Sequence, residues 1–214
     1  MDDTLRITEI FYSLQGESTK VGLPTVFVRL TGCPLRCHYC DTAYAFKGGQ
    51  KRKMTDILQE VQKYKTRHVC VTGGEPLAQP GCITLLTLLC DAGFAVSLET
   101  SGALDISAVD KRVMTILDFK TPGSGEVTRN LYANINYLKA SDQVKFVICD
   151  RPDYDFSVNL CHQYKLFDGC EVLFSPSKGQ IHEKILADWI IQDQLPVRYQ
   201  VQLHKILWGD TAGV

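Results

Sequence analysis

The chain has almost no net charge, no long apolar run and no low-complexity segment. Its 214 residues include 23 Lys and Arg against 24 Asp and Glu, a formal net charge of −1. This balance excludes a global basic field of the kind that attracts nucleic acid or an anionic membrane. No run of about eighteen apolar residues occurs, so we expect no membrane-spanning helix. The segment from Met1 to Glu9 lacks the apolar core of a secretory signal, so we expect a cytoplasmic protein.

Cysteine, by contrast, is plentiful, with nine residues. An odd number cannot all pair within a monomer, and clustered thiols in a reducing compartment are more often metal ligands than disulfides. Three of them, Cys33, Cys37 and Cys40, fall within eight positions. The other six stand mostly among apolar neighbours and are interpreted as small core residues. These are Cys70, Cys82, Cys90, Cys149, Cys161 and Cys170.

Short β-rich runs alternate with helical patterns along the chain. Strands are expected over residues 7–14, 25–30, 68–72, 95–100, 115–119, 143–148, 172–175 and 197–202. Helices are expected over residues 55–64, 81–92, 105–111, 127–137, 153–164 and 182–192. This alternation predicts an α/β fold of parallel strands, with functional groups at their carboxyl ends. The length and an ordinary apolar content of 45% suit a single domain over residues 1–214.

The cysteine triplet lies in the run TGCPLRCHYCDT, which follows an expected strand and ends at Thr42. Thiolates at this spacing can wrap one face of a cubane iron–sulfur cluster, which four thiolates ordinarily close. With no fourth cysteine nearby, one iron would stay open, much as a catalytic zinc keeps one free position. A structural zinc site is the alternative, with Cys70, His38 or a distant histidine as fourth ligand. Thiols without any metal are the other alternative.

Two motifs together resemble the radical S-adenosylmethionine (SAM) superfamily. One is the cysteine triplet with Tyr39 before its last member, and the other is the run TGGEP from Thr72. Glycine suits the second motif because the missing Cβ lets a ligand approach the backbone closely. The resemblance implies a trimmed TIM-like barrel with mostly parallel strands and outer helices. It also implies a [4Fe–4S] cluster on the three cysteines, with SAM on the open iron.

Further segments are similar to the 7-carboxy-7-deazaguanine synthase family from about residue 6 onward. They are EIFYSLQGE from Glu9, FVRL from Phe27, CDT from Cys40, ETSG from Glu99, DFK from Asp118 and QLHK from Gln202. The similarity implies conversion of 6-carboxy-5,6,7,8-tetrahydropterin to 7-carboxy-7-deazaguanine with loss of ammonia, in queuosine and 7-deazapurine biosynthesis. An electron from the cluster would cleave SAM, and the 5′-deoxyadenosyl radical would take hydrogen from substrate C6 before SAM is regenerated.

The family resemblance also implies roles for individual residues. Cofactor contacts are expected at Tyr39, Cys40, Asp41, Gly74, Ser101, Asp118, Phe119, Lys120, Ser175, Pro176, Ser177 and Lys178. Substrate contacts are expected at Leu14, Gln15, Gly16, Arg29, Thr72 and Val214. Arg29 would offer its planar fork to a carboxylate, although a strand arginine more often faces solvent. Thr42 matches a Mg²⁺ ligand, since a hydroxyl is a hard oxygen donor, and its alternative role is a helix cap.

The family also implies partners: the small-molecule pterin, an electron donor such as flavodoxin or ferredoxin, and a second copy in a homodimer. Neither nucleic acid nor a membrane is expected. Two departures stand out, because Ser18 follows QGE where glycine is commoner and Ser175-Pro176 stands where Gln-Pro is frequent. Two other functions remain open: a glycyl-radical-enzyme activating enzyme, which needs neither QGE nor CDT, and a noncatalytic zinc or iron–sulfur module.

Overall fold

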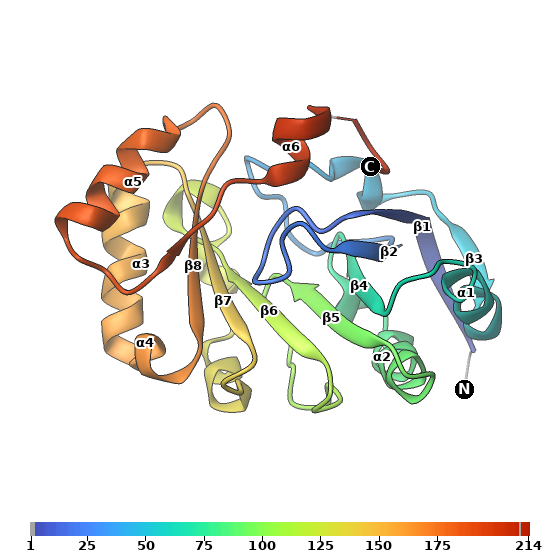
Figure 1. The fold of residues 1–214 in the computed structure, drawn as a ribbon. Helices are drawn as coiled ribbons and strands as arrows, with labels where there is room; N and C mark the ends of the chain where they lie inside the picture. Colours follow the sequence, from blue (N-terminus) through green and yellow to red (C-terminus); the bar gives the residue numbers. More distant parts are fainter. Residues whose placement is uncertain (1–2, 210) are drawn as a thin grey trace.

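One mixed sheet runs through the computed structural model, which describes residues 3–209 and 211–214 (Figure 1). Its strands are β1 (Thr4–Leu14), β2 (Pro24–Leu30), β3 (Gln50–Lys53), β4 (His68–Gly73), β5 (Ala95–Thr100), β6 (Met114–Phe119), β7 (Gln143–Ile148), β8 (Glu171–Pro176) and β9 (Arg198–Tyr199). Their order across the sheet is β3-β1-β2-β4-β5-β6-β7-β8-β9. β1 is antiparallel to both neighbours, and every pair from β2 to β9 is parallel. The predicted trimmed barrel of mostly parallel strands is confirmed.

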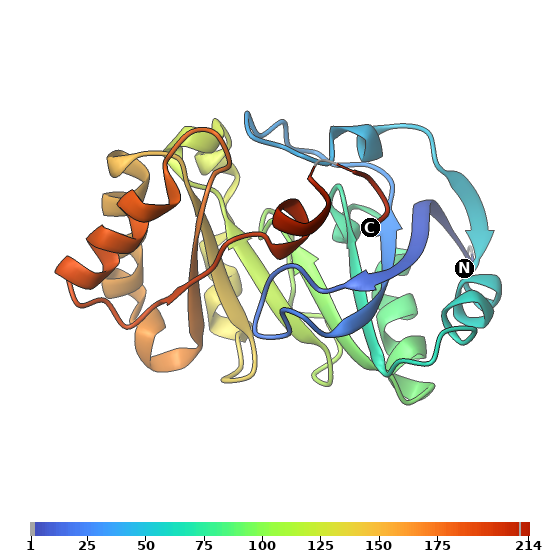
Figure 2. The ribbon, with the colours of Figure 1, turned by 45° about the horizontal axis from the view of Figure 1, so that its top comes forward.

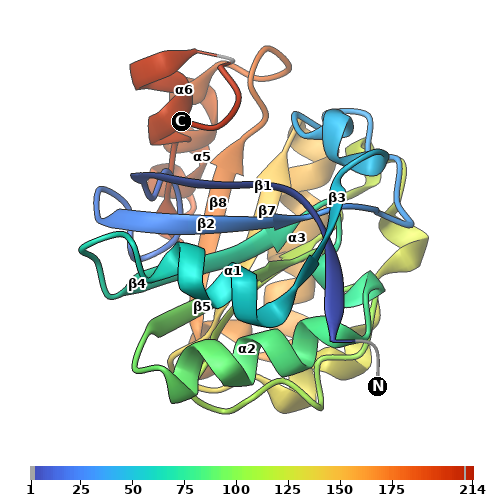
Figure 3. The same cartoon turned by 90° about the vertical axis from the view of Figure 1, so that its right-hand side faces the viewer.

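All described helices except the last cover the outer, convex face of the sheet. The helices are α1 (Met54–Val61), α2 (Gly81–Asp91), α3 (Arg151–Tyr164), α4 (Leu166–Gly169), α5 (Glu183–Gln192) and α6 (Leu203–Trp208). α1 and α2 bury an aliphatic core against β1, β2, β4 and β5, whereas α3 and α5 cover an aromatic-rich core on β6 to β8 (Figure 3). α6 lies apart from both layers, across the mouth of the barrel (Figure 2). Among the described helices, none is long and apolar enough to cross a membrane.

The strand alternation places polar side chains on the concave face. Because successive side chains point to opposite faces of a strand, the apolar set packs under the helices and the intervening residues face inward. The inward set includes Arg29 on β2, Thr72 on β4, Glu99 on β5, Asp118 on β6 and Lys145 on β7. Arg29 is paired in register with Thr72, and Asp118 with Lys145. Neighbouring strands therefore present charged and polar groups side by side.

Two predicted helices are wrong. Residues 105–111 form turns, because the carboxylate of Asp105 accepts the Ser107 N–H at 2.8 Å and that of Asp110 accepts the Arg112 N–H at 2.9 Å. Such local side-chain bonds compete with helical hydrogen bonding.

The expected helix over 127–137 is replaced by two 3₁₀ segments, Val127–Arg129 and Tyr132–Tyr137. Asn130 accepts the Lys120 N–H at 2.9 Å, and Asn134 donates to the Leu104 carbonyl at 2.8 Å. Both asparagines tie this segment to neighbouring loops instead of continuing a helix. The sequence also missed β3 and α6, and β9 is shorter than the strand expected over 197–202.

Candidate active site

A cavity of about 430 Å³ opens at the carboxyl ends of the parallel strands. Its walls come from the loop after β2, the ends of β4, β5 and β6, the loop after β8, and α6. The predicted site residues that line it are Leu14, Gln15, Gly16, Arg29, Cys33, Cys37, Tyr39, Cys40, Asp41, Thr42, Thr72, Gly74, Ser101, Asp118, Lys120, Ser177, Lys178 and Val214. Segments far apart in the sequence thus converge on one space.

Three predicted residues do not line the cavity. The ring of Phe119 is buried in the core, with its centroid 6.1 Å from that of Phe146. Ser175 and Pro176, at the end of β8, are also buried. Any contact of Phe119 with a ligand would therefore have to come from its backbone.

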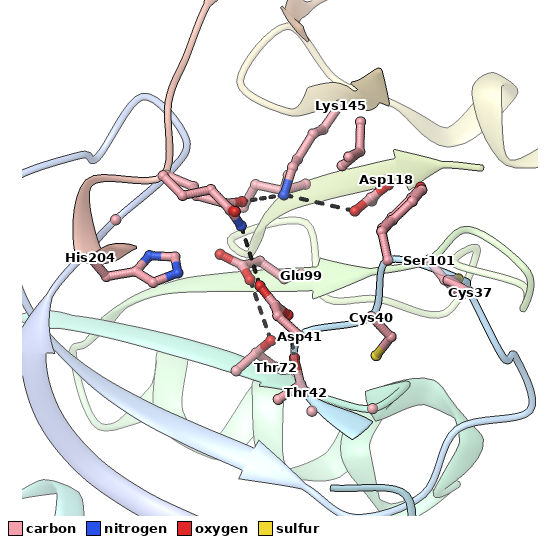
Figure 4. Close-up of a pocket in the computed structure, with 18 of the residues that line it drawn as sticks. Cys37, Cys40, Asp41, Thr42, Thr72, Glu99, Ser101, Asp118, Lys145 and His204 are labelled. Carbon is pink, nitrogen blue, oxygen red and sulfur yellow. Dashed lines mark hydrogen bonds and ion pairs between the residues drawn. The ribbon is translucent and has the colours of Figure 1, made fainter. Parts of the chain in front are cut away.

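We call Cys33, Cys37, Tyr39, Cys40 and Gly74 the thiol side of the cavity. All three cysteines are half-buried and line the cavity, and Figure 4 shows Cys37 and Cys40 on the loop after β2. Burial raises the pKa of Cys33, and the Leu35 N–H, which donates to Cys33 Sγ at 3.4 Å, offsets only part of this effect. Burial raises the pKa of the Cys37 thiol to about 11, so ionisation there depends on a bound cation.

The loop geometry explains why position 74 is glycine. A Cβ on Gly74 would lie 2.4 Å from the Gly32 carbonyl oxygen and 2.7 Å from Cys33 Cβ. The Glu75 N–H donates to that same Gly32 oxygen at 2.8 Å, so the two motif-bearing loops are in direct contact. The missing side chain therefore serves the close approach of the cysteine loop, in addition to any ligand.

Of the suggested fourth ligands, His38 lines the cavity and Cys70 does not. The ring of His38 packs against Gly125, in the loop after β6. Cys70 is fully buried on β4, where the nearby carboxylate of Glu99 is among the causes of its raised pKa, after burial itself. No three His, Cys, Asp or Glu side chains among the described residues are grouped as ligands of one ion. A multi-iron cluster instead binds each thiolate at a different iron, so its ligands do not have to converge on one point.

Two buried hydroxyls lack a partner, one on the thiol side and one at the end of β8, outside the cavity lining. Tyr39 Oη and Ser175 Oγ have no hydrogen bond to any residue that the structure describes. Buried polar atoms are nearly always satisfied, so an unpartnered one at a cavity indicates a missing ligand or water. Ser101 differs, because its hydroxyl donates to the buried Glu75 carboxylate at 2.5 Å. The donor set of the thiol side therefore fits an iron–sulfur cluster with an organic ligand beside it.

We call Glu17, Arg29, Glu99, Lys145 and His204 the ionic side of the cavity. Lys145 forms a short ion pair with Glu17 and lies 3.8 Å from Asp118 Oδ2 (Figure 4). Burial alone would lower the pKa of Lys145, but the carboxylates of Glu17 and Asp118 outweigh burial and raise it. Conversely, burial would raise the pKa of Glu17, yet Lys145 holds it below its ordinary value. Both groups are therefore charged at neutral pH.

Glu99 behaves in the opposite way, although it lies on the same side. Burial and the neighbouring charge of Glu17 raise its pKa. Its two oxygens accept hydrogen bonds from Gln15 at 3.4 Å and from Thr72 at 3.3 Å. The ionic side thus holds one stable carboxylate and one carboxyl that takes up a proton more easily.

The C-terminal run from Gln202 to Lys205 closes this side. Gln202 donates to Glu17 Oε1 at 2.5 Å, and Lys205 pairs with Asp41 Oδ2 at 2.7 Å. The Asp41 Oδ1 atom accepts the Thr42 hydroxyl at 2.8 Å. The QLHK run, to which the sequence assigned no role, therefore connects the QGE and CDT motifs.

Two details of the QGE turn depend on this same segment. A Cβ on Gly16 would lie 2.1 Å from Nδ1 of His204, so only glycine allows the imidazole to pack there. Ser18 adopts a left-handed φ of 66°, the conformation that glycine reaches without strain. Its N–H donates to Gln200 Oε1 at 2.6 Å, and Gln200 Nε2 donates back to its carbonyl at 2.8 Å. This two-point clamp holds the serine that departs from the usual motif.

Several lining residues were missed in the sequence, above all Lys145, Gln202 and His204. Lys145 did carry a signal, because it interrupts the otherwise apolar strand QVKFVI. Gln202 and His204 carried none that periodicity reveals. Gln202 is the N-cap of the short helix α6 and His204 lies within it, and this helix follows a two-residue strand.

Comparison with known proteins agrees with this geometry. The radical SAM superfamily model matches residues 27–119. The 7-carboxy-7-deazaguanine synthase of Chlorobaculum tepidum is 42% identical, over 98% of this chain and 97% of its own length. That of Koribacter versatilis is 40% identical, over 98% and 100%. The crystal structure of QueE from Escherichia coli superposes with a TM-score of 0.78 at 22% identity, covering 94% of this chain and 95% of that one.

The open barrel, the cysteine loop and these matches define a radical SAM enzyme. Its cofactors are accordingly a [4Fe–4S] cluster and SAM. More narrowly, the chain belongs to the 7-carboxy-7-deazaguanine synthase family, since relatives above 30% identity align over nearly its full length.

Proposed function

We propose that this enzyme converts 6-carboxy-5,6,7,8-tetrahydropterin to 7-carboxy-7-deazaguanine with release of ammonia. The observation that carries the proposal is the meeting of three family segments at one cavity. Gln202 of QLHK bonds to Glu17 of QGE, and Lys205 bonds to Asp41 of CDT. An activating enzyme that acts on a protein glycine requires neither QGE nor CDT. A cavity lined by charged side chains also suits a small polar heterocycle better than a peptide backbone.

The substrate would lie between the two sides of the cavity. Arg29 would hold its carboxylate, while Gln15, Thr72 and Glu99 would offer hydrogen-bond partners to the pterin edge, with Leu14, Gly16 and Val214 completing the wall. Because its pKa is raised, Glu99 can hold or release a proton at a ring nitrogen. The bound cluster and SAM would supply a radical that removes one hydrogen atom from the substrate.

The cofactors would lie on the thiol side. Cys33, Cys37 and Cys40 would ligate the cluster. The SAM contacts we propose are Tyr39, Cys40, Asp41, Gly74, Ser101, Asp118, Phe119, Lys120, Ser175, Pro176, Ser177 and Lys178. Thr42 would bind Mg²⁺, because its hydroxyl proton is committed to Asp41 Oδ1 and its lone pairs are left for a cation.

We also propose the wider setting of the enzyme. A flavodoxin or ferredoxin would supply the electron, and two copies would form a homodimer. One sheet joins the described residues, which supports a single domain over 1–214. All nine cysteines are free, which supports a reducing compartment such as the cytoplasm.

The decisive experiment is anaerobic incubation of the reconstituted enzyme with SAM, dithionite, Mg²⁺ and the carboxypterin. We expect a product with the mass of 7-carboxy-7-deazaguanine, released together with ammonia. Cleavage of SAM without that product would contradict the proposed substrate. A protein that binds zinc instead of iron under these conditions would contradict the proposed chemistry altogether.

The magnesium role has its own test, in Thr42→Ala. Removing the hydroxyl takes away one oxygen ligand, so we expect a weaker dependence of turnover on Mg²⁺ with unchanged iron content. Measuring rate against Mg²⁺ concentration checks this, and an unaltered dependence would remove Thr42 from the metal site.

A further inference from the structure

Glu9 opens the run EIFYSLQGE but has no role in the site described so far. It lies on β1 opposite Arg29 of β2, in register. Its Oε1 atom accepts the Arg29 Nε–H at 2.7 Å. The pair is largely shielded from water, with 15% of the Arg29 side chain and 22% of the Glu9 side chain exposed. Pairs this protected keep more of their interaction than surface pairs do.

Two aromatic rings hold the same guanidinium. Its Cζ atom lies 5.7 Å from the ring centroid of Phe11 and 5.9 Å from that of Tyr44. The Tyr44 hydroxyl donates to the same Glu9 oxygen at 2.7 Å. Tyr44 belongs to the 3₁₀ segment Ala43–Phe46, which begins directly after Thr42. One carboxylate oxygen therefore joins β2 to the loop that carries the proposed metal ligand.

We propose that Glu9 is the positioning residue that orients Arg29 toward the carboxylate of the substrate. The proposal rests on the proposed function. A guanidinium can bind a carboxylate through Nε with one terminal nitrogen, or through its two terminal nitrogens. Because Glu9 occupies Nε, only the terminal pair is left for the cavity. The substrate carboxylate is thus received end-on, in one orientation.

Glu9 also has an effect that works against binding. As an anion beside Arg29, it competes with the negative charge of the substrate. Orientation and competition make opposite predictions for a variant that lacks the carboxylate, and this makes the role of Glu9 testable. Our proposal requires that orientation outweighs competition.

The experiment measures equilibrium binding to the reconstituted holoenzyme with SAM, Mg²⁺ and an oxidised cluster, so that no turnover occurs. Two ligands are compared, the 6-carboxytetrahydropterin and 6-methyltetrahydropterin, which lacks the carboxylate. We expect Glu9→Ala to weaken binding of the carboxylated ligand roughly tenfold or more, the usual effect of losing a hydrogen bond to a charged group. Binding of the methyl ligand should be unchanged. Glu9→Gln should retain most of the affinity, because its amide oxygen still accepts the Nε–H.

Two further variants separate the orientation of Arg29 from a general effect on the sheet. Glu60→Ala is the matched control, since Glu60 of α1 pairs with Arg52 of β3 at 2.6 Å, and neither residue lines the cavity. It should bind both ligands as the wild type does. In an Arg29→Lys background Glu9→Ala should no longer weaken binding of the carboxylated ligand, because Lys has no Nε–H to orient. If Glu9→Ala folds poorly, Glu9→Leu takes its place in both comparisons, because it fills the space of the side chain without offering an acceptor to the Nε–H.

Several results would overturn the inference. Unchanged or tighter binding of the carboxylated ligand by Glu9→Ala would make Glu9 a mere competing anion. Equal weakening of both ligands would make it a structural residue. If the wild type itself does not prefer the carboxylated ligand, the proposed function fails, and the inference fails with it. If the wild type prefers the carboxylated ligand and Glu9→Ala binds that ligand equally well, the inference is refuted and the proposed function stands.

Discussion

The two sides of the cavity differ in how their polar groups are satisfied. On the ionic side, Lys145 is paired with Glu17, and Arg29 with Glu9, so the protein neutralises its own charges. On the thiol side, the buried hydroxyl of Tyr39 lacks a hydrogen-bond partner among the described residues. Folding alone therefore completes the ionic side, whereas the thiol side is completed by its cofactors. Substitutions should accordingly cost stability on one side and cofactor loading on the other.

The largest expected effect is that of Cys37→Ala. Because the triplet supplies every proposed protein ligand, we expect loss of the cluster and of SAM cleavage. The fold should persist, since the thiol is only half-buried and is not part of the helix-covered cores. Iron content, deoxyadenosine formation and circular dichroism check the three parts.

The matched control is Cys170→Ala, at a half-buried cysteine that does not line the cavity. It should retain iron and activity. Retention of the cluster by Cys37→Ala would contradict the assignment of the thiol side.

On the ionic side, Lys145→Met tests the expectation that a substitution there lowers stability. It leaves the buried carboxylate of Glu17 without its cation, and breaking such a pair costs about 3–5 kcal/mol of unfolding free energy. Urea denaturation measures this loss. The exposed pair of Lys184 with Asp188 provides the control, because Lys184→Met should cost less than about 1 kcal/mol. Similar costs for both variants would show that the ionic side is not a buried network.

A smaller effect is expected from Gly74→Ala. The added Cβ would displace the cysteine loop from Gly32 and Cys33, at a cost of about 1–3 kcal/mol, with weaker iron retention during reconstitution. Gly169→Ala is the control, because a Cβ there would meet nothing within 4 Å. If Gly74→Ala loads iron as the wild type does, the contact between the two loops does not shape the thiol side.

Glu99→Gln should give the smallest change in unfolding free energy. Unlike the preceding substitutions, it should stabilise the fold. The pKa of Glu99 is raised in the folded state, so its ionisation destabilises the fold above that pKa. The penalty disappears as pH falls through the folded pKa toward the ordinary value near 4.3. At neutral pH the amide variant should therefore be more stable by about 1 kcal/mol.

This gain in the stability of Glu99→Gln should vanish in acid. The substitution should also abolish turnover, because the amide cannot hold or release the proton. Urea denaturation at neutral and acidic pH tests the pattern. A constant difference across pH would mean that ionisation of Glu99 is not its cause.

The sequence predicts the parallel strands well, because apolar runs such as HVCVTG and QVKFVI are bounded by clear turns. It also predicts most of the cavity lining through short motifs. It does not predict which motifs touch, since the Glu17–Lys145 pair spans 128 positions. Nor does it predict α6, whose position depends on tertiary contacts such as the Leu203 N–H to the Gly16 carbonyl. One wrong helix failed for a local reason, the turn at Asp105, and the other because Asn130 and Asn134 bond to neighbouring loops.

The contact of residues 200–205 with the QGE turn has a consequence for biosynthesis. Synthesis proceeds from the N-terminus, so the ribosome releases the cysteine loop and the glycine motif long before Gln200 and Lys205. In a nascent chain the three cysteines would therefore be available for iron well before residues 200–205 can close the ionic side of the cavity. Metal delivery and substrate competence become separate events in the maturation of this enzyme.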